Sequence, residues 1–335
     1  MIKTGIIGAG YWGPNLIRNF STIPEVSIKY IADKLPGRRK FAEENFPDIQ
    51  TVDNADVIFN DNEISLVVIA TPVDTHFRLA REALLSGKHI FVEKPFTDST
   101  REAEELLDLA TDNSLKIGVG HLFTFHPAIE HIHGFINTTG EFRPYYLISN
   151  RANLRPPESK NNVIWDLAVH DFSIINYLFN EFPLSVYAVA HDYSGRGLSD
   201  MAVIQLSYPD NKKAVVHVGW HTPNKIRKFE LYGAKWSIFF DDMARQKVRI
   251  FDEGIDTRIG ADKQSSQKFE YRPGVVLEPE IGNAQPLLSE CRSFIEHIVN
   301  DGTPYRNNGM QGIWAVRMCE LSEESAKKGR EMYFE

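Results

Sequence analysis

Apolar runs and segments with helical spacing alternate along the first 120 residues of the chain. The apolar runs predict strands at Ile2–Gly8, Ile28–Asp33, Leu66–Ala70, His89–Glu93 and Lys116–Gly120. Between them, recurring apolar positions predict helices at Pro14–Phe20, Pro36–Asn45, Thr75–Ser86 and from a Ser99 cap to Asn113. The run Leu66–Ala70 has no polar residue, as expected of a strand buried on both faces. This alternation predicts a doubly wound, parallel α/β sheet.

The pattern changes after about residue 140. A loop rich in Pro and Asn, Ala152–Asn162, is predicted before a helix at Ile164–Leu178. Turn residues then separate β-like runs, which indicate an open, mainly antiparallel sheet: Ser185–Ala190, Ala202–Ser207, Ala214–Trp220, Phe229–Tyr232 and Trp236–Phe240. The polar stretch Asp252–Gln267 is predicted to be a mobile loop, and two further helices are predicted at Leu287–Asn300 and Met310–Lys328. We therefore expect two domains: residues 1–120, and an α+β domain of residues 121–335 whose last helix can pack back on the first.

Composition limits the classes of protein that the chain can be. The 335 residues are 42% hydrophobic and 24% charged with a net charge of −8, which is typical of a globular protein. The acidic balance argues against nucleic-acid and anionic-membrane partners, and no apolar run approaches the roughly 20 residues that span a bilayer. Cys291 and Cys319 cannot form a disulfide framework or a cysteine-based metal site. We expect a soluble cytoplasmic protein without a metal.

A glycine-rich motif follows the first predicted strand. Gly8-Ala9-Gly10-Tyr11-Trp12-Gly13 has the form G-x-G-x-x-G and opens a helix, and Asp33 lies twenty residues beyond its last glycine. In a dinucleotide-binding turn such glycines let the pyrophosphate approach the backbone at the helix N-terminus. Asp33 would bind the ribose hydroxyls, which favours NAD over NADP, although Arg38 and Arg39 could accommodate a 2′-phosphate. The motif predicts an NAD site; the alternative is a tight turn that binds nothing.

Further cofactor contacts are predicted where strands end, because ligands bind at the carboxyl edge of open α/β sheets. Thr71 and Pro72 follow the strand Leu66–Ala70, and His76 opens the next helix. For His76 the alternative is an exposed histidine at a helix start. In the glycine motif itself, Tyr11 and Trp12 could contact the cofactor through their backbone N–H groups.

The sequence Glu93-Lys94-Pro95 ends the fourth predicted strand at the same edge. Lys94 would place an ammonium near the nicotinamide and the reacting oxygen, with Glu93 beside the cofactor. Pro95 restricts the Lys94 backbone to an extended form and permits a cis bond. A Lys-Pro pair at a strand end can also be a solvated turn.

A carboxylate and an imidazole share one face of an apolar helix. Asp166 and His170 are four residues apart within the predicted helix Ile164–Leu178. A charged pair among apolar residues calls for a structural or functional reason, because burying an unpaired charge costs free energy. One reason is a capping aspartate in an ion pair with the histidine. The other is an orienting carboxylate beside a histidine that acts as general base.

Taken together, these motifs resemble the glucose-fructose oxidoreductase/inositol dehydrogenase (Gfo/Idh/MocA) family. The resemblance rests on GAGYWG, on Ala70-Thr71-Pro72, on Glu93-Lys94-Pro95 and on the later D-x-x-x-H from Asp166 to His170. It implies a Rossmann domain joined to an open-sheet substrate domain, NAD(P)-dependent oxidation of a sugar or cyclitol alcohol, and a homo-oligomer, either a dimer or a tetramer. It also implies that Lys94 aligns the substrate hydroxyl, that His170 is the general base and that Asp166 supports the site.

The segment N-x-x-W-D-L-A-x-H-D, from Asn162 to Asp171, resembles the nucleotide-sugar branch of this family. That branch implies oxidation at C3 of a UDP-N-acetylated hexose or hexuronate. Arg151, Asn153 and Arg155, in the segment before the helix, would bind the anionic part of such a sugar, because arginine binds carboxylate or diphosphate through paired hydrogen bonds. Surface ion pairs are the alternative for the arginines. For the whole chain the alternatives are an inositol or free-sugar dehydrogenase and an NAD-binding sensor without catalysis.

Overall fold

Two units make up the chain in this computed structural model, which describes residues 1–138, 140, 142–154, 161–258, 268–300 and 302–334. Unit 1 contains Met1–His126 and Ala284–Glu320, and unit 2 contains Pro127–Asn283 and Leu321–Glu335. Ala284–Glu320 thus groups with the first unit, whereas the sequence pattern assigns it to the second domain. The reason is that a helix within this segment completes the core of unit 1.

Unit 1 is a doubly wound α/β domain, and the predicted fold class is confirmed. Its six strands are all parallel and have the order β3-β2-β1-β4-β5-β6. The strands are β1 (Ile2–Ile7), β2 (Val26–Ala32), β3 (Gln50–Val52), β4 (Leu66–Ile69), β5 (His89–Glu93) and β6 (Ile117–Gly120). Every residue of β4 is buried, which explains its uniformly apolar sequence. The short β3 carries no apolar run and is not predicted by the sequence pattern.

The helices of unit 1 follow its strands in the chain. They are α1 (Gly13–Ser21), α2 (Pro36–Asn45), α3 (Asp56–Phe59), α4 (His76–Leu85), α5 (Thr100–Asp112), α8 (Pro286–Val299) and the first part of α9 (Gly309–Lys328). Ser99 caps α5 as predicted, because its side chain accepts a hydrogen bond from the Glu102 N–H at 3.3 Å.

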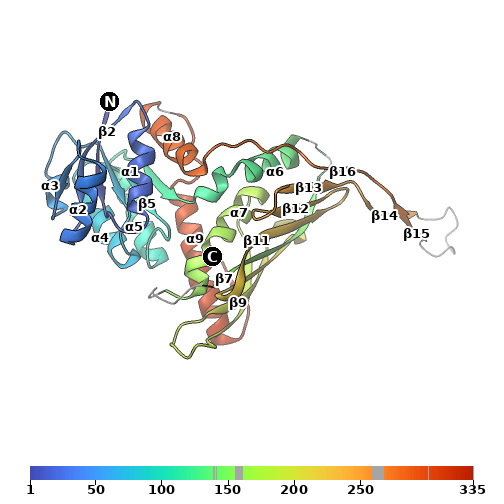
Figure 1. The fold of residues 1–335 in the computed structure, drawn as a ribbon. Helices are drawn as coiled ribbons and strands as arrows, with labels where there is room; N and C mark the ends of the chain where they lie inside the picture. Colours follow the sequence, from blue (N-terminus) through green and yellow to red (C-terminus); the bar gives the residue numbers. More distant parts are fainter. Residues whose placement is uncertain (139, 141, 155–160, 259–267, 301, 335) are drawn as a thin grey trace. The chain divides into compact units, whose positions relative to one another are not determined.

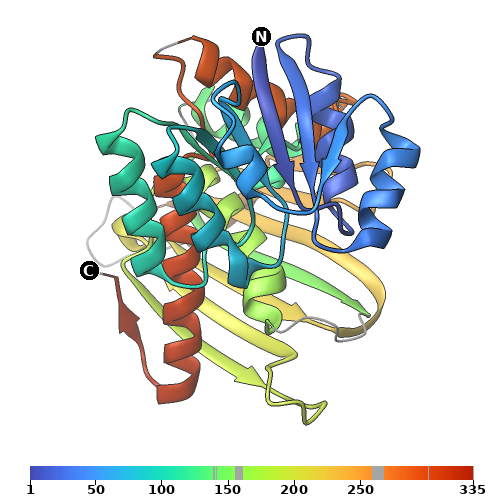
Figure 2. The same cartoon turned by 90° about the vertical axis from the view of Figure 1, so that its left-hand side faces the viewer.

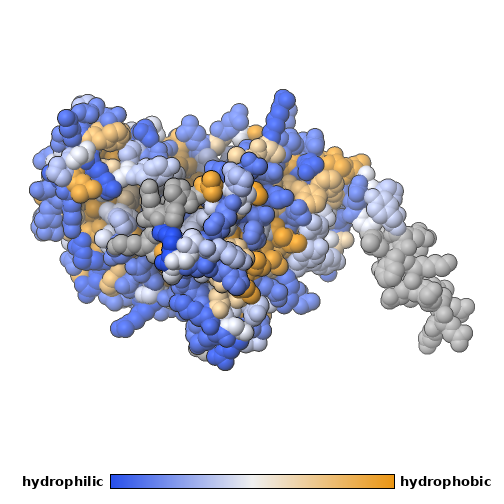
Figure 3. Space-filling model, turned by 60° about the horizontal axis from the view of Figure 1, so that its bottom comes forward, coloured by the Kyte–Doolittle hydropathy of each residue, from blue (hydrophilic) through white to orange (hydrophobic). Residues whose placement is uncertain are grey.

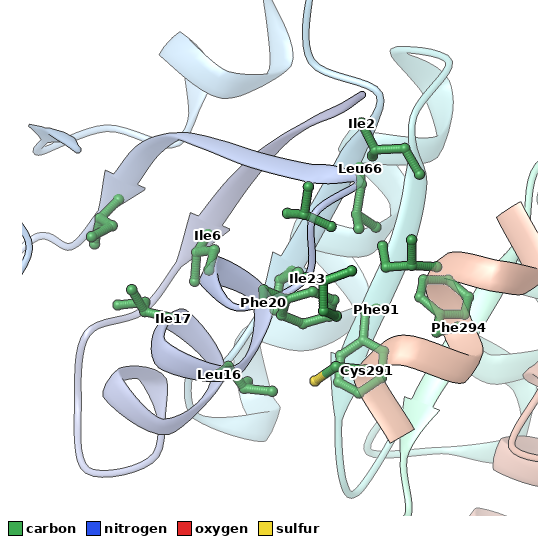
Figure 4. Close-up of a cluster of buried hydrophobic side chains, with 14 of the residues drawn as sticks. Ile2, Ile6, Leu16, Ile17, Phe20, Ile23, Leu66, Phe91, Cys291 and Phe294 are labelled. Carbon is green, nitrogen blue, oxygen red and sulfur yellow. The ribbon is translucent and has the colours of Figure 1, made fainter. Parts of the chain in front are cut away.

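One apolar cluster joins the sheet of unit 1 to two helices. Phe20 of α1, Phe91 of β5 and Phe294 of α8 are fully buried, and the Phe91 ring lies 5.6 Å from each of the other two. Figure 4 shows these rings together with Ile2, Ile6 and Leu66 from the strands and Cys291 from α8. Burying a large side chain in such a cluster contributes about 1.5–3 kcal/mol to stability. Because Cys291 and Phe294 belong to this cluster, α8 is part of the core of unit 1 although it lies far from the strands in the sequence.

Unit 2 is built on a nine-stranded sheet with the order β16-β13-β12-β11-β7-β10-β9-β8-β17. The pair β7 and β10 is parallel and every other described pair is antiparallel, as predicted for a mainly antiparallel sheet. The strands are β7 (Pro144–Leu154), β8 (Ser185–His191), β9 (Met201–Ser207), β10 (Lys213–Gly219), β11 (His221–Gly233), β12 (Ser237–Asp241), β13 (Val248–Phe251), β16 (Val276–Leu277) and β17 (Met332–Tyr333). In Figure 2 the C-terminal strand β17 lies at an edge of this sheet.

Helices cover one face of the sheet in unit 2. α6 (Pro127–Thr138) packs on α7 (Val169–Phe179), and α7 packs on β7 (Figure 1). A π-helical turn, Ile164–Ala168, leads directly into α7. The opposite sheet face carries exposed apolar side chains, among them Ile148, Val189 and Val203.

Parts of two predicted loops are strands. Ala152, Asn153 and Leu154 end β7 and do not belong to a loop; residues 155–160 lie outside the described part of the chain. Within the predicted mobile loop, Gly254–Arg258 forms β14, which pairs with β15 (Lys268–Arg272). Residues 259–267 lie outside the described part as well. Among the helices that the structure describes, none is long and apolar enough to cross a membrane.

Candidate functional site

The glycine motif forms the turn between β1 and α1. Gly8 has a φ of +103°, and a Cβ there would lie 2.5 Å from the carbonyl oxygen of Ala70. A Cβ on Gly13 would lie 2.1 Å from the carbonyl oxygen of Gly8. Neither position can therefore hold a side chain without moving the backbone. The Trp12 side chain does not cap α1, so N–H groups of its first turn remain available to a phosphate.

Asp33 lies immediately after β2 and braces this turn. Its Oδ2 accepts a hydrogen bond of 2.8 Å from the Ala9 N–H, and its Oδ1 accepts one of 2.9 Å from the Leu35 N–H. Nη1 of Arg38 lies 3.6 Å from Oδ2 of Asp33, and the Arg38 side chain is 46% exposed. A carboxylate that is held in place beside an exposed guanidinium can accept hydrogen bonds from ribose hydroxyls.

A cavity of about 480 Å³ opens beside Asp33 in unit 1. It is lined by residues that follow three parallel strands, including Gly8 after β1, Asp33 after β2, and Thr71 and Pro72 after β4. This is the carboxyl edge of the sheet, where dinucleotides bind in this architecture. The side-chain-free turn, the helix N-terminus and the carboxylate together fit the adenosine and pyrophosphate of a dinucleotide.

The remaining predicted cofactor residues differ in exposure. Tyr11 is 93% exposed, whereas His76 is 1% exposed. The ring nitrogens of His76 each lie 2.8 Å from a backbone carbonyl oxygen, Nδ1 from Pro95 and Nε2 from Thr71. Burial lowers the pKa of His76, although the two carbonyl groups favour the charged ring. His76 thus braces two turns at the sheet edge, and its contact with the cofactor stays a prediction.

Glu93 ends β5 at the same edge, Lys94 follows it, and the Lys94–Pro95 peptide bond is cis. The Glu93 side chain is only 8% exposed. Its Oε1 accepts a hydrogen bond of 2.6 Å from the indole N–H of Trp12, and its Oε2 accepts a weaker one of 3.3 Å from the Lys94 N–H. Burial raises the pKa of Glu93 to about 7, and the charge of Lys94 acts in the opposite direction. The glycine turn and the lysine are therefore connected through one carboxyl group.

Asp166 and His170 lie in unit 2, at the junction of the π-helical turn and α7. Both are partly exposed, while Leu167, Ala168 and Val169 between them are buried. Oδ2 of Asp166 accepts a hydrogen bond of 3.2 Å from Nε1 of Trp220, a residue between β10 and β11. The sheet thus fixes the carboxylate.

Arg151 has a partner that the sequence pattern does not suggest. Its Nε and Nη2 donate to the two oxygens of Asp171 at 2.8 and 3.2 Å, and the Ser149 hydroxyl donates to the same carboxylate at 2.7 Å. The Arg151 and Asp171 side chains are 6% and 4% exposed. This buried pair commits the guanidinium to the contact between β7 and α7. The Asn153 side-chain oxygen is buried without a hydrogen-bond partner in the described chain, and Arg155 lies outside the described residues.

Three polar residues near Glu93 are absent from the sequence-based prediction. Glu290 of α8, His121 after β6 and Asn307 before α9 are all at most 2% exposed. Nδ2 of Asn307 donates to Oε1 of Glu290 at 2.9 Å and to the backbone oxygen of His121 at 3.0 Å. No motif marks them; the signal in the sequence is a glutamate among the apolar positions of the amphipathic segment Leu287–Asn300.

Comparison with known proteins identifies both halves of the chain. A family model described as "Oxidoreductase family, NAD-binding Rossmann fold" matches residues 2–121, and one described as "GFO/IDH/MocA C-terminal domain" matches residues 129–239. The UDP-N-acetylglucosamine 3-dehydrogenase of Acidithiobacillus ferrooxidans is 31% identical over 189 residues, which are 56% of this chain and 58% of that protein. The inositol 2-dehydrogenase of Rhizobium meliloti is 24% identical over 345 residues, which are 99% and 98% of the two chains.

Solved structures have the same fold. GenD2 from gentamicin A biosynthesis, crystallised in complex with NAD, superposes with a TM-score of 0.84 at 19% identity, covering 100% of this chain and 96% of that one. The structure of the Acidithiobacillus ferrooxidans dehydrogenase gives a TM-score of 0.82 at 22% identity and covers 98% of each chain.

Proposed function

The chain belongs to the Gfo/Idh/MocA family of NAD-binding oxidoreductases, and on this basis we propose that it oxidises a secondary alcohol of a nucleotide sugar. The proposed substrate is a UDP-linked N-acetylated hexose or hexuronate, oxidised at C3. The observation that carries the proposal is the place of Lys94. It follows β5 at the sheet edge where the glycine turn follows β1 and the cavity residues Thr71 and Pro72 follow β4.

In the proposed reaction His170 accepts the proton of the substrate hydroxyl as general base. Lys94 donates a hydrogen bond to the same oxygen and stabilises the negative charge that develops there. Asp166, held by Trp220, maintains the orientation of the helix turn that carries the base. Bound NAD would supply the hydride acceptor. An NAD-binding sensor would have no need for Lys94, Asp166 and His170 together, which favours an enzyme.

We propose NAD as the cofactor in preference to NADP. The Asp33 carboxylate lines the cavity and is fixed by two backbone N–H groups, so a 2′-phosphate would meet a negative charge there. Arg38 lies within reach of that carboxylate and partly offsets its charge. The proposed contacts to the pyrophosphate come from the backbone at Gly10, Tyr11 and Trp12.

The sequence relationship to a UDP-N-acetylglucosamine 3-dehydrogenase supports the nucleotide-sugar assignment. One observation favours a neutral cyclitol instead. Arg151, which we expected to bind an anionic sugar, holds Asp171 within unit 2, so an anion would need other cationic partners. An inositol-type substrate, as in the relative from Rhizobium meliloti, is therefore the second candidate.

A substrate panel separates these candidates. Purified protein with NAD is given UDP-N-acetylglucosamine, its uronate, myo-inositol and free glucose in turn, and NADH formation is followed by absorbance. We expect turnover with a UDP-sugar and its loss in His170→Ala. Turnover with myo-inositol alone would establish the second candidate, and tight NAD binding without any turnover would support the sensor.

We further propose that the protein forms a homo-oligomer through the uncovered face of the nine-stranded sheet. A groove of about 590 Å³ on this face is lined by Tyr146, Ile148 and Val215, among others. In Figure 3 hydrophobic residues gather among hydrophilic ones on the part of unit 2 that this view brings forward. Exposed apolar patches of this kind mark interfaces. Light scattering that finds a stable monomer at micromolar concentration would contradict this proposal.

The number of cysteines agrees with the location expected from the sequence. Cys291 and Cys319 are both buried, Cys291 in α8 and Cys319 in α9. Two cysteines do not make a disulfide framework of the kind that secreted proteins carry, and we propose that the protein acts in the cytoplasm.

A further inference from the structure

Asn162 accepts hydrogen bonds from three successive N–H groups at the start of the turn that carries Asp166. Its side-chain oxygen Oδ1 accepts one of 3.0 Å from the Ile164 N–H and a longer one of 3.4 Å from the Trp165 N–H. Its backbone oxygen accepts one of 3.1 Å from the Asp166 N–H. Asn162 is buried, so no solvent replaces these bonds easily. The start of the turn therefore depends on this one asparagine.

The hydrogen-bond pattern changes within the turn. The Asp166 N–H donates four residues back, to Asn162, as in an α-helix. The Val169 N–H donates to the oxygen of Ile164, five residues back as in a π-helix, and to that of Leu167. The change from α-helical to π-helical bonding thus comes after Asp166. The position of Asp166 about the helix axis is set from Asn162, and the π bond acts on the residues that follow.

The amide of Asn162 has a further partner on the C-terminal helix. Its Nδ2 donates to Oε1 of Glu323, in the part of α9 that belongs to unit 2. A carboxylate only accepts hydrogen bonds, and an amide donates only through its nitrogen. With Nδ2 bound to Glu323, Oδ1 is the atom that faces the N–H groups of Ile164 and Trp165. Glu323 thus selects the amide orientation in which Asn162 caps the turn.

Asp166 is held from the sheet as well. Its Oδ2 accepts the hydrogen bond of 3.2 Å from the indole of Trp220, which is 4% exposed. The Trp220 N–H donates to the backbone oxygen of Asp200 at 3.0 Å, so the donor is itself fixed. Successive residues of a helix are rotated by about 100°, and a small rotation of the turn would carry the carboxylate away from the indole. His170 lies four residues further along the same helix and moves with it.

We propose that Asn162 and Glu323 are positioning residues for the turn that carries Asp166 and His170. Glu323 orients the amide of Asn162, and the amide oxygen holds the start of the turn. In that position the turn brings Asp166 to the indole of Trp220 and presents His170. Neither Asn162 nor Glu323 contacts the substrate in this role. The effect on turnover rests on the proposed function, whereas the effect on the bond between Asp166 and Trp220 does not.

A reversal of hydrogen-bond polarity tests the proposal. Asn162→Asp keeps an acceptor for the turn but sets a second carboxylate against Glu323. Aspartate caps helices as well as asparagine does, so a cap that acted alone would tolerate the change. We expect instead a kcat about tenfold lower with an unchanged Kd for NAD, because a small misplacement of reacting groups is costly in rate. In Asn162→Asp/Glu323→Gln the glutamine amide donates to the new carboxylate, and we expect most of the lost kcat to return.

Glu324→Gln provides the matched control, because Glu324 is the next residue of α9 and pairs with Lys328. Asn162→Asp/Glu324→Gln should stay as slow as Asn162→Asp. A native kcat in Asn162→Asp, or no recovery on adding Glu323→Gln, would overturn the proposal. Thermal denaturation shows whether each variant is folded. If Asn162→Asp is not, Glu323→Ala takes its place: it leaves Asn162 intact and should also lower kcat, and a native kcat in this variant would overturn the proposal.

The Trp220 indole gives a readout that needs no substrate. In protein with isotope-labelled tryptophan, the nitrogen–proton signal of this indole is assigned by its absence in Trp220→Phe. We expect the signal to move in Asn162→Asp toward its position in Asp166→Ala, and to return in Asn162→Asp/Glu323→Gln. An unmoved signal in Asn162→Asp would contradict the positioning role even if the native protein oxidises a UDP-sugar. A signal that responds as expected, in a protein that turns over no substrate, would refute the proposed reaction and leave the positioning role in place.

Discussion

The indole nitrogen of Trp12 donates a 2.6 Å hydrogen bond to Oε1 of Glu93, a residue 81 positions later in the chain. Through this bond the glycine turn after β1 is attached to the residue that precedes Lys94. The residues expected to meet the cofactor and the residue expected to align the substrate are therefore parts of one hydrogen-bonded assembly in unit 1.

Loss of this bond should destabilise the protein in a pH-dependent way. In Trp12→Phe the ring is kept and the donor is lost, and a hydrogen bond to a charged group contributes about 1.5–3 kcal/mol. We expect that loss in the free energy of unfolding at about pH 8, where Glu93 is ionised, and a smaller one at about pH 5. Urea denaturation at the two pH values measures it. Trp314→Phe serves as control, and an equal loss at both pH values would contradict the charged state of Glu93.

The buried Glu93 also predicts how stability changes with pH. Its pKa is about 7 in the folded protein against a usual value of 4.5, so the folded state binds this proton more tightly than the unfolded state does. Stability from this group is therefore highest below about pH 4.5 and falls as the pH rises to about 7, by up to roughly 3 kcal/mol. Glu93→Gln removes this slope. We expect its Tm, relative to the native protein, to increase from about pH 5 to about pH 8, and a constant difference would refute the prediction.

Cofactor choice depends on Asp33 and Arg38. Asp33→Asn keeps the side-chain volume and removes the negative charge, so it should weaken NAD binding by about tenfold and improve the ratio of NADP to NAD binding. Arg38→Ala, made in the native protein, should lower the affinity for NADP and leave the affinity for NAD without a comparable loss. Isothermal titration with both cofactors measures these changes. Arg39→Ala is a suitable control, because Arg39 donates to the backbone oxygens of Asp33 and Lys34 and not to the carboxylate.

The Arg151–Asp171 pair should behave as a structural contact of unit 2. Removing one partner of a buried ion pair leaves an uncompensated charge and costs about 3–5 kcal/mol. We expect this loss in Arg151→Leu and in Asp171→Leu, and a much smaller loss in the double variant. Chemical denaturation of the four proteins completes the cycle. If Arg151→Leu left stability unchanged and raised KM instead, the arginine would be a substrate ligand.

His170→Ala should lower turnover by roughly 10²–10⁴-fold and leave NAD affinity nearly unchanged, because a general base acts on the substrate proton. Steady-state kinetics and NAD titration on the same preparation separate the two effects. His131→Ala, a helix histidine of the same unit, is the control. Unchanged turnover in His170→Ala would remove this residue from the proposed mechanism.

Local sequence signals predict most of unit 1. Strands β1, β4, β5 and β6 are buried apolar runs, and Ser99 caps α5 as its place before the helix predicts. The sequence does not reveal β7 as a strand, because Ser149 and Arg151 look like loop residues until Asp171 is brought beside them. Glu290 likewise gains its neighbours only from Asn307 and from strands far away in the chain. Contacts between distant polar residues leave no periodic pattern in the sequence. The glycine motif, which is a local pattern, is therefore predictable, whereas the polar cluster of Glu290, His121 and Asn307 near Glu93 is not.

The π-helical turn at Ile164–Ala168 has a consequence for how this region can vary. A π turn holds one more residue than the α-helical turn it replaces, so deleting a single residue there would yield a regular helix. Each residue of an α-helix is rotated by about 100° from the next, and Asp166 would then turn away from Trp220 while His170 kept its place. The number of residues between Ile164 and His170 is thus fixed as firmly as their identity is. A library of single-residue deletions should tolerate changes at Ser194–Leu198, between β8 and β9, and none within the π turn.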